Sequence, residues 1–166
     1  VISFTNPPVN GLSHAVRSEL ATALARAAED RTVQGVVLIG GGGQFSGGAD
    51  IREFGTAAMY QEPTLRQLIE QVESSGKPVV AALAGICLGG GLELASAAHI
   101  RVADASTYFA LPEGQRGLFT GGGATIRVAD LVGKARMIDM MLTGRVYKGA
   151  EAVAVGLTQY LVEGSS

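Results

Sequence analysis

The sequence holds few of the residues that build metal centres, disulfide frameworks or nucleic-acid surfaces. Its single cysteine, Cys87, excludes an intramolecular disulfide and a cysteine-rich zinc site. Its two histidines, His14 and His99, are too far apart for an HExxH metal pair, so we interpret both as solvated or structural residues. A net charge of −2 gives no basic surplus, and no apolar run reaches the ~18 residues of a membrane-spanning helix. We therefore expect no metal, nucleic acid or membrane among its partners.

Charged residues and proline are also scarce, whereas glycine is in excess. The charged fraction is 17%, against a typical ~25%, which indicates that much of the chain is buried or lies against a partner. The 24 glycines are about twice the typical share, but only 5 prolines accompany them. The glycines therefore do not form a Pro/Gly-rich linker, and we expect them to have local backbone roles.

The length of 166 residues fits one domain that can bury its own core. The chain begins inside an apolar run at Val1 rather than at a methionine, and it ends abruptly in a polar stretch. No signal peptide or transit segment is visible. We therefore expect residues 1–166 to form a single domain that is incomplete at both ends.

Short apolar runs alternate with helix-like segments along the whole chain, which predicts an α/β fold with parallel strands. Ser13 is the expected N-cap of the first helix, and Pro63 is expected in the first turn of the second. The expected strands are 1–4, 35–39, 79–84, 100–103, 108–111 and 157–162. The expected helices are 13–30, 63–74, 92–98, 121–132, 135–142 and 150–155.

The glycine runs fit none of the common phosphate-binding or nucleophile motifs. A dinucleotide GxGxxG pattern that starts at Gly41 fails at Ser46, and one that starts at Gly89 fails at Leu94. No Gly-Lys pair is followed by serine or threonine, and no GxSxG nucleophile elbow is present. We therefore do not interpret these glycines as a dinucleotide-binding loop, a P-loop or a nucleophile elbow.

Clustered backbone donors are the remaining interpretation. Residues 89–91 follow a strand and open a helix, so their N–H groups and the helix dipole would favour an anionic oxygen. The loop 45–50 offers a second such patch at Gly48 and Ala49, and two N–H groups from two loops would make an oxyanion hole. The alternatives are close helix–strand packing at 89–91 and an ordinary loop at 47–49.

Two glutamates complete the candidate site. Glu93 falls in the first turn of the helix that follows the glycines, and Glu113 follows an apolar strand. Two nearby carboxylates push their pKa values apart, which suits the addition or removal of water across a double bond. The alternatives are that Glu93 compensates the helix dipole and that Glu113 is an exposed loop acid. Asp50 and Arg52 are interpreted as a surface pair, and Cys87 as a small buried hydrophobe.

These motifs resemble the crotonase superfamily, the enoyl-CoA hydratases and isomerases, over nearly the whole chain. The matching segments, in the family's order, are 45–51 (FSGGADI), 77–82 (KPVVAA), 85–95 (GICLGGGLELA), 111–113 (LPE) and 141–145 (MLTGR). The resemblance implies an α/β spiral of ββα units, usually assembled as homotrimers or dimers of trimers. It also implies acyl-CoA thioester substrates, with coenzyme A as part of the substrate and no separate cofactor. We expect a cytoplasmic enzyme of fatty acid metabolism.

The resemblance also assigns roles to individual residues. The N–H groups of Ala49 and Gly90 would bind the thioester oxygen and stabilise an enolate. Glu93 and Glu113 match the two glutamates that handle the water and the α-carbon proton in family hydratases. The residues expected to line the substrate are Gly47, Ala49, Asp50, Ile51, Arg52, Gly89 and Gly90. Together these assignments predict an enoyl-CoA hydratase.

One segment departs from the family pattern. Hydratases of the family often carry Pro-Gly-Ala-Gly-Gly-Thr-Gln after the second glutamate, whereas residues 120–126 read TGGGATI. The chain also lacks the family's first strand region and its C-terminal helical segment. A double-bond isomerase, a hydratase-lyase, a thioester hydrolase and a non-catalytic acyl-CoA-binding subunit therefore stay open as alternatives.

Overall fold

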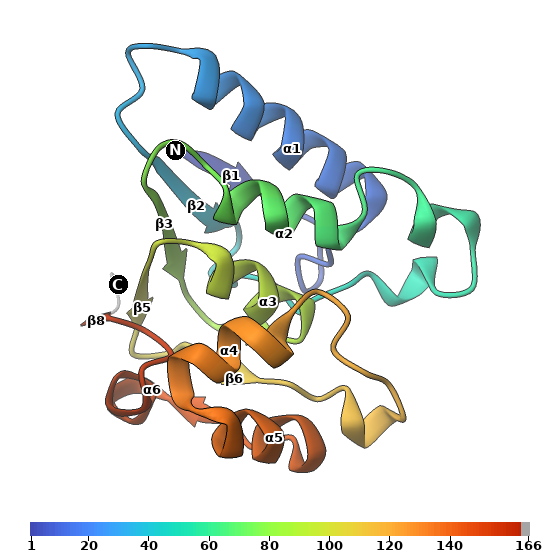
Figure 1. Ribbon diagram of the computed structural model, residues 1–166, viewed down its shortest axis with the longest axis vertical. Helices are drawn as coiled ribbons and strands as arrows, with labels where there is room; N and C mark the ends of the chain where they lie inside the picture. The colour runs from blue at the N-terminus through green and yellow to red at the C-terminus, as the bar shows by residue number, and fades with distance from the viewer. Residues whose placement is uncertain (164–166) are drawn as a thin grey trace.

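The computed structural model describes residues 1–163, in which one face of a five-stranded sheet is covered by helices (Figure 1). All neighbouring strands of this large sheet are parallel, as the alternation of strand and helix predicts. The strands, in sheet order, are β1 (Ile2–Phe4), β2 (Val36–Gly40), β3 (Val79–Leu83), β5 (Ile100–Asp104) and β8 (Tyr160–Val162).

A second, three-stranded sheet was not expected as a separate unit. It consists of β4 (Ile86–Leu88), β6 (Tyr108–Ala110) and β7 (Tyr147–Lys148), in the order β4-β6-β7. The β4–β6 pair is parallel, but β6 and β7 are antiparallel, which is the one departure from the expected parallel strands. A two-residue strand such as β7 is too short to show an apolar period, so the sequence gives no sign of it.

The chain passes repeatedly from the large sheet to the small one and then into a helix. Strands β3 and β4 lead into α3, and strands β5 and β6 lead towards α4. The helices are α1 (His14–Glu29), α2 (Leu65–Glu73), α3 (Gly90–Ala97), α4 (Ala124–Val132), α5 (Lys134–Thr143) and α6 (Gly149–Val155). The expected ββα units are therefore present, and each helix lies within a few residues of its predicted range.

Two helix starts test the sequence signals directly. Ser13 caps α1 as expected, because its hydroxyl accepts a hydrogen bond from the Val16 N–H. Pro63, in contrast, lies before α2 rather than in its first turn. Thr64 is the N-cap, and it forms a reciprocal capping box with Gln67 that outweighs the positional preference of proline.

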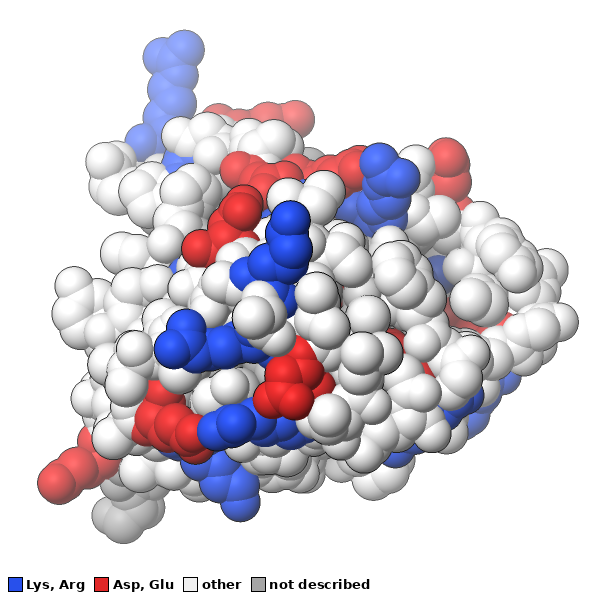
Figure 2. Space-filling model, turned by 60° about the horizontal axis from the view of Figure 1, so that its bottom comes forward, with Lys and Arg blue, Asp and Glu red and all other residues white. Residues whose placement is uncertain are grey.

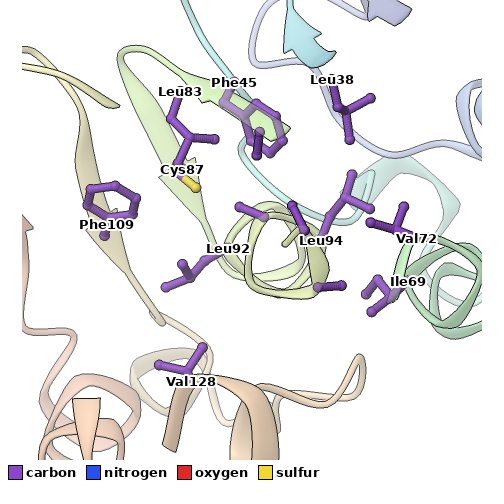
Figure 3. Packing of buried hydrophobic residues seen from close by; sticks show 14 of the residues in the cluster. Leu38, Phe45, Ile69, Val72, Leu83, Cys87, Leu92, Leu94, Phe109 and Val128 are labelled. Carbon is purple, nitrogen blue, oxygen red and sulfur yellow. The ribbon is translucent and has the colours of Figure 1, made fainter. Parts of the chain in front are cut away.

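Helix α3 lies at the centre of the molecule, and all eight of its residues are buried. Figure 3 shows Leu92 directed towards Phe109 and Val128, while Leu94 points towards Val72 on α2. Helices α2 and α4 thus pack on two sides of α3, which fixes its N-terminus relative to both sheets. No helix in residues 1–163 has the length and apolar character needed to cross a lipid bilayer.

Candidate active site

The loop 45–50 and the first turn of α3 are in direct backbone contact. A methyl group added at Gly48 would lie 2.9 Å from the Gly90 nitrogen, and one added at Gly90 would lie 3.1 Å from the Ala49 nitrogen. Within residues 1–163, neither the Ala49 N–H nor the Gly90 N–H donates to a backbone or side-chain acceptor. The structure therefore places the two expected oxyanion donors side by side, with both donors free.

Main-chain hydrogen bonds hold this loop against the small sheet. The Ser46 N–H donates to Ile86 O (2.9 Å), and the Leu88 N–H donates to Ser46 O (3.0 Å). The Ser46 hydroxyl donates to Asn10 O (2.7 Å) and accepts from the Gly48 N–H (3.0 Å). Gly48 has a φ of +100°, a conformation that side chains rarely adopt. The glycines of this loop are thus required by a close approach between two backbones, rather than by an ordinary loop.

Asp50 differs from its interpretation as half of a surface pair. Its carboxylate is buried and accepts hydrogen bonds from Arg52 Nε (2.8 Å), Arg52 Nη2 (2.6 Å) and Asn6 Nδ2 (3.1 Å). These hydrogen bonds, led by those from Arg52, lower the pKa of Asp50 to about 2. Only Arg52 is at the surface, where its side chain is 65% exposed. Asp50 instead fixes the loop through a turn that sequence spacing does not reveal.

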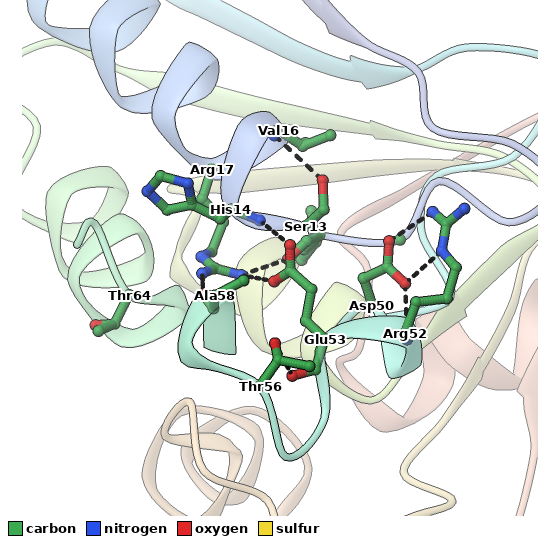
Figure 4. Close-up of polar contacts among 12 residues, drawn as sticks. Ser13, His14, Val16, Arg17, Asp50, Arg52, Glu53, Thr56, Ala58 and Thr64 are labelled. Carbon is green, nitrogen blue, oxygen red and sulfur yellow. Dashed lines mark hydrogen bonds and ion pairs between the residues drawn. The ribbon is translucent and has the colours of Figure 1, made fainter. Parts of the chain in front are cut away.

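A buried ion pair joins the next part of this loop to α1 (Figure 4). Glu53, in the 3₁₀ helix Ile51–Glu53, accepts from Arg17 Nη1 (3.0 Å) and from the His14 N–H (2.7 Å). Arg17 also donates to three main-chain oxygens, those of Leu12, Ala58 and Pro63. The loop that carries Ala49 is therefore attached to the first turns of α1 immediately after Asp50.

The remaining residues expected to line the substrate gather at the same place. Gly47 and Ala49 lie in the loop, and the Ile51 side chain next to them is 77% exposed. Gly89 and Gly90 are buried at the start of α3. The predicted set thus forms one contiguous region, and its role in binding remains a prediction.

Glu93 lies one turn into α3, and its carboxylate contacts the start of α4 rather than its own helix end. Its Oε1 accepts hydrogen bonds from the Gly122 N–H (2.8 Å) and the Ala124 N–H (3.1 Å). Burial raises the pKa of Glu93, and these two N–H donors together with Arg127 act in the opposite direction. Glu93 lies in the first turn of α3, but compensation of its own helix dipole is not its whole role, because its hydrogen bonds are made to another helix.

Glu113 lies just before the 3₁₀ helix Gly114–Arg116, with its side chain turned towards α3. A methyl group at Gly89 would lie 2.7 Å from Glu113 Oε1, so the carboxyl group lies against the residue that precedes the Gly90 donor. Its Oε2 is buried and has no hydrogen-bond partner among the described residues. Burial, with a smaller contribution from the negative charge of Glu93, raises the pKa of Glu113 to about 7. Glu113 is therefore not an exposed loop acid.

Two nonpolar side chains of α2 lie beside the backbone donors and Glu93. Leu65 lies against Gly90, and Ile69 lies against Gly122, where added methyl groups would approach them to 2.8 Å and 2.7 Å. Among the described residues, no three His, Cys, Asp or Glu side chains gather in a way that could hold a metal ion. The arrangement can hold a carbonyl oxygen that becomes negative and can move protons beside it.

Sequence reasoning missed the helix start that binds Glu93. Residues 121–123 had no assigned role, although three glycines before a helix leave several N–H groups unpaired. Gly122 and Ala124 supply two such groups, and a methyl group at Gly122 would lie 2.6 Å from Glu93 Oε2. Two features together could have predicted this contact. A helix that begins after glycines offers unpaired N–H donors, and a buried carboxylate needs hydrogen-bond donors.

A separate hollow of about 430 Å³ lies between α5, β7 and α6, and none of the predicted site residues lines it. Its rim carries Arg145, which is paired with Glu151 (3.0 Å) and Asp139 (3.8 Å). Figure 2, turned to show the lower end of the molecule, shows basic and acidic side chains interspersed rather than gathered by sign. This hollow is therefore distinct from the paired donors and glutamates.

Comparison with known proteins bears on the family to which the chain belongs. The family model for enoyl-CoA hydratase/isomerase matches residues 1–164. The peroxisomal bifunctional enzyme of Danio rerio is 41% identical over 98% of this chain, and the probable enoyl-CoA hydratase of Bacillus subtilis (strain 168) is 38% identical over 95% of it. The solved enoyl-CoA hydratase of Bacillus anthracis superposes with a TM-score of 0.87 at 34% identity, covering 93% of this chain and 62% of that one.

A second solved enoyl-CoA hydratase, from Thermoplasma volcanium GSS1, has a TM-score of 0.90 at 29% identity and covers 98% of this chain and 67% of that one. The chain spans only 22% of the Danio rerio protein and 63% of the Bacillus subtilis protein. The predicted α/β spiral is confirmed, because the match runs through both sheets and all six helices. The chain belongs to the enoyl-CoA hydratase/isomerase family, the crotonase superfamily.

Proposed function

We propose that this protein adds water across the 2,3 double bond of an enoyl-CoA thioester. The observation that carries the proposal is the placement of two glutamates, Glu93 and Glu113, beside the free N–H groups of Ala49 and Gly90. An enzyme that only needs to polarise a thioester requires the donors alone. Two buried carboxyl groups with raised pKa values suit a reaction that moves two protons.

The two donors would stabilise the negative charge that develops during the reaction. The thioester oxygen accepts both N–H groups, and it becomes an enolate oxygen when water attacks C3. Preorganised donors of this kind contribute about 3 kcal/mol each in a site that excludes water. Because the donors belong to the main chain, they need no rearrangement at the moment of reaction.

The two glutamates would divide the proton transfers between them. The water oxygen bonds to C3 while a water proton passes to Glu93, and the electrons of the double bond move onto the thioester. Glu113 then delivers its proton to C2, and passage of the proton from Glu93 to Glu113 restores both groups. Glu93 suits the first role because two N–H donors support its ionised form, and Glu113 suits the second because it is partly protonated near pH 7.

The substrate's CoA portion would lie along the loop that contains Gly47 and residues 49–52. Arg52 is 65% exposed there and can contact a phosphate group. In this proposal CoA enters as part of the substrate, and no separate cofactor takes part. The acyl chain would extend past Leu65 and Ile69 of α2.

Assembly and location also belong to the proposal. We expect a homotrimer or a dimer of trimers, to be measured by light scattering coupled to size-exclusion chromatography of the full-length protein. We expect a cytoplasmic enzyme, by analogy with the bacterial relative, although the name of the Danio rerio relative places that protein in peroxisomes. Microscopy of the tagged full-length protein decides the location.

The test is direct hydration by full-length protein. Crotonyl-CoA and longer 2-enoyl-CoAs are supplied, the loss of enoyl absorbance is followed, and the product is identified by mass spectrometry and chromatography. A 3-hydroxyacyl-CoA product supports the proposal. Absence of turnover at every chain length refutes it, and CoA binding without turnover would indicate a non-catalytic acyl-CoA-binding subunit.

A different reaction on the same scaffold is the second candidate, and residues 120–126 favour it. Their sequence, TGGGATI, differs from the usual family segment, and their N–H groups determine where the Glu93 carboxylate lies. A double-bond isomerase would return a shifted enoyl-CoA, a hydratase-lyase would release a shortened fragment, and a thioester hydrolase would release free CoA. Product analysis of the same assays separates these outcomes.

A further inference from the structure

Arg127 connects two helices on either side of Glu93. It lies on α4, and its guanidinium donates to both carboxylate oxygens of Glu73 on α2, with Nε–Oε1 at 2.8 Å. Its Nη1 donates to the main-chain oxygen of Gly122 at 3.1 Å. The Arg127 side chain is 15% exposed, whereas that of Glu73 is 52% exposed. One side chain therefore reaches from the surface of α2 to the glycine segment that opens α4.

Gly122 is held from both sides by this arrangement. Its N–H donates to Glu93 Oε1, and its carbonyl oxygen accepts from Arg127. Gly122 and its neighbours Gly121 and Gly123 have no side chains to pack, so their position depends on bonds to the main chain. A methyl group at Gly123 would collide with the Arg127 guanidinium, which shows how closely that group covers the segment.

The charge of Arg127 also faces Glu93 and lowers the pKa of that carboxyl group, against the effect of burial. Among the other charged groups, Glu113 lies across the site from Glu93, with Arg116 beside it in the following 3₁₀ helix. On α2, the negative charges of Glu70 and Glu73 act on Arg127 rather than on Glu93 directly. Arg127 is therefore the positive charge that supports ionised Glu93.

We propose that Arg127 is a positioning residue for Glu93, which fixes the Gly122 donor and favours the ionised carboxylate that accepts a proton from water. This inference rests on the hydratase function proposed above. Arg127 does not touch the reacting atoms in this view, since it acts through Gly122 and through its charge. A purely structural ion pair between α2 and α4 would affect stability alone.

Three variants of the full-length protein separate geometry from charge. Arg127→Met removes both, Arg127→Lys keeps the charge but cannot bridge Glu73 and Gly122 with a planar fork, and Glu73→Gln weakens the anchor from α2. Arg145→Met is the matched control, because Arg145 is also paired with two acids but lies at the rim of the separate hollow. For each protein, kcat and KM of hydration are measured as functions of pH.

We expect Arg127→Met to lower kcat by about tenfold or more while KM changes by less than about twofold. Its acid limb should move to higher pH, because the loss of a positive charge raises the pKa of Glu93. Arg127→Lys should keep the acid limb of the wild type but lose roughly threefold in kcat, and Glu73→Gln should lose a similar factor. Arg145→Met should match the wild type in both measurements.

A second readout is independent of turnover. Glutamate labelled with ¹³C at the carboxyl carbon reports each titration by NMR, and Glu93→Gln assigns the Glu93 signal. A higher Glu93 pKa in Arg127→Met supports the inference even if no enoyl-CoA is hydrated, so failure of the proposed function is recognised separately. An unchanged kcat, acid limb and Glu93 titration in a folded Arg127→Met protein overturns it. If that variant does not fold, an unchanged kcat in both Arg127→Lys and Glu73→Gln overturns it.

Discussion

The Glu113 side chain carries a buried carboxyl oxygen without a partner in the described structure, an arrangement that costs stability unless a ligand group completes it. A water molecule or a polar substrate group bound beside this oxygen would satisfy this requirement. Folding alone offers no reason to place an acid against Gly89 in this way. The geometry at this residue therefore argues for chemistry and not for structural support.

Replacement of Glu113 by glutamine should separate catalysis from binding. Glutamine keeps the shape but cannot deliver a proton, so kcat should fall by about 10²–10⁴-fold. KM should change little, because the donors at Ala49 and Gly90 and the rest of the loop 45–50 are unaltered. Steady-state kinetics on the best enoyl-CoA measures both values. Glu19→Gln, on the exposed side of α1, is the control, and a loss of less than about tenfold in Glu113→Gln would remove Glu113 from the mechanism.

The close approach of the two donor-bearing segments can be tested by a substitution at Gly48. Alanine there would place a methyl group 2.9 Å from both Gly90 N and Leu88 O. Neither backbone atom can move without displacing the end of β4 or the start of α3. We expect kcat to fall by about tenfold or more. Gly43→Ala is the matched control, because Gly43 also has a positive φ but nothing lies near its added methyl group. Equal kcat values for the two variants would show that catalysis does not depend on this close backbone approach.

At the scale of residues, the sequence predicts features that are caused by neighbouring residues in the chain, and it misses those caused by distant ones. The two donor-bearing segments were predictable, since glycines after strands expose N–H groups, and the family resemblance singled out Ala49 and Gly90 within them. The binding of Glu93 to Gly122 was not predictable, because it depends on how α3 packs against α4. The burial of Asp50 was missed because it depends on a local turn and on a contact with Asn6, which is distant in the sequence.

At the scale of elements, the attachment between α1 and the 3₁₀ helix Ile51–Glu53 depends mainly on one side chain, Arg17. Removal of Arg17 would leave the Glu53 carboxylate without its cation in a mostly buried site, and four further hydrogen bonds would lose their donor or geometry. We expect Arg17→Met to lower the free energy of unfolding by about 3–5 kcal/mol. Urea denaturation followed by circular dichroism measures the change.

The control for this prediction is the exposed pair between Arg66 and Glu70 on α2. Such (i, i+4) pairs contribute about 0.3–0.5 kcal/mol, so Arg66→Met should have an unfolding free energy close to that of the wild type. If Arg17→Met and Arg66→Met destabilise the protein equally, the attachment at Glu53 has no special energetic weight.

Helices and long strands were predicted well because their signals are periodic and local. The helix α1 has a capping serine and an apolar face, and β2 and β3 are continuous apolar runs. The short strand β7 and the three 3₁₀ helices contain too few residues for any period. The antiparallel pairing of β6 with β7 follows from the path of the chain through α5, which no local pattern encodes.

At the scale of the whole molecule, the raised pKa of Glu113 makes stability depend on pH in a defined direction. The folded protein holds this proton up to about pH 7, whereas the unfolded chain releases it near 4.5. Between these values the folded state binds more protons, so the free energy of unfolding should fall as pH rises from about 4.5 to about 7. Above that window the contribution of Glu113 is constant.

Comparison with Glu113→Gln isolates this contribution from those of other groups. The variant cannot titrate, so the wild type should lose stability relative to it across the same pH window. Denaturation midpoints measured every half unit of pH test the trend. A difference that stays flat, or that grows in favour of the wild type as pH rises, would contradict a buried neutral Glu113.

The overall class was open to prediction, since strand–helix alternation indicates an α/β fold and five ordered motifs indicate one family. The division of the strands into two sheets was not, because it depends on which strands hydrogen-bond after the chain turns at Gly85. The loop residue Ser46, which lies outside both sheets, nevertheless bridges to Cys87 in β4 of the small sheet. That bridge places the two donor-bearing segments next to each other.

The bridge between Ser46 and Cys87 has a consequence for how this scaffold can change. Because main-chain hydrogen bonds set the spacing of the donors, that spacing is insensitive to which side chains surround the acyl group. Leu65 and Ile69 of α2 approach the donors and Glu93 from a separate helix. In the proposed reaction, substitutions there would alter the preferred acyl group while the donors keep their spacing, so selectivity and catalytic power could evolve, or be engineered, independently.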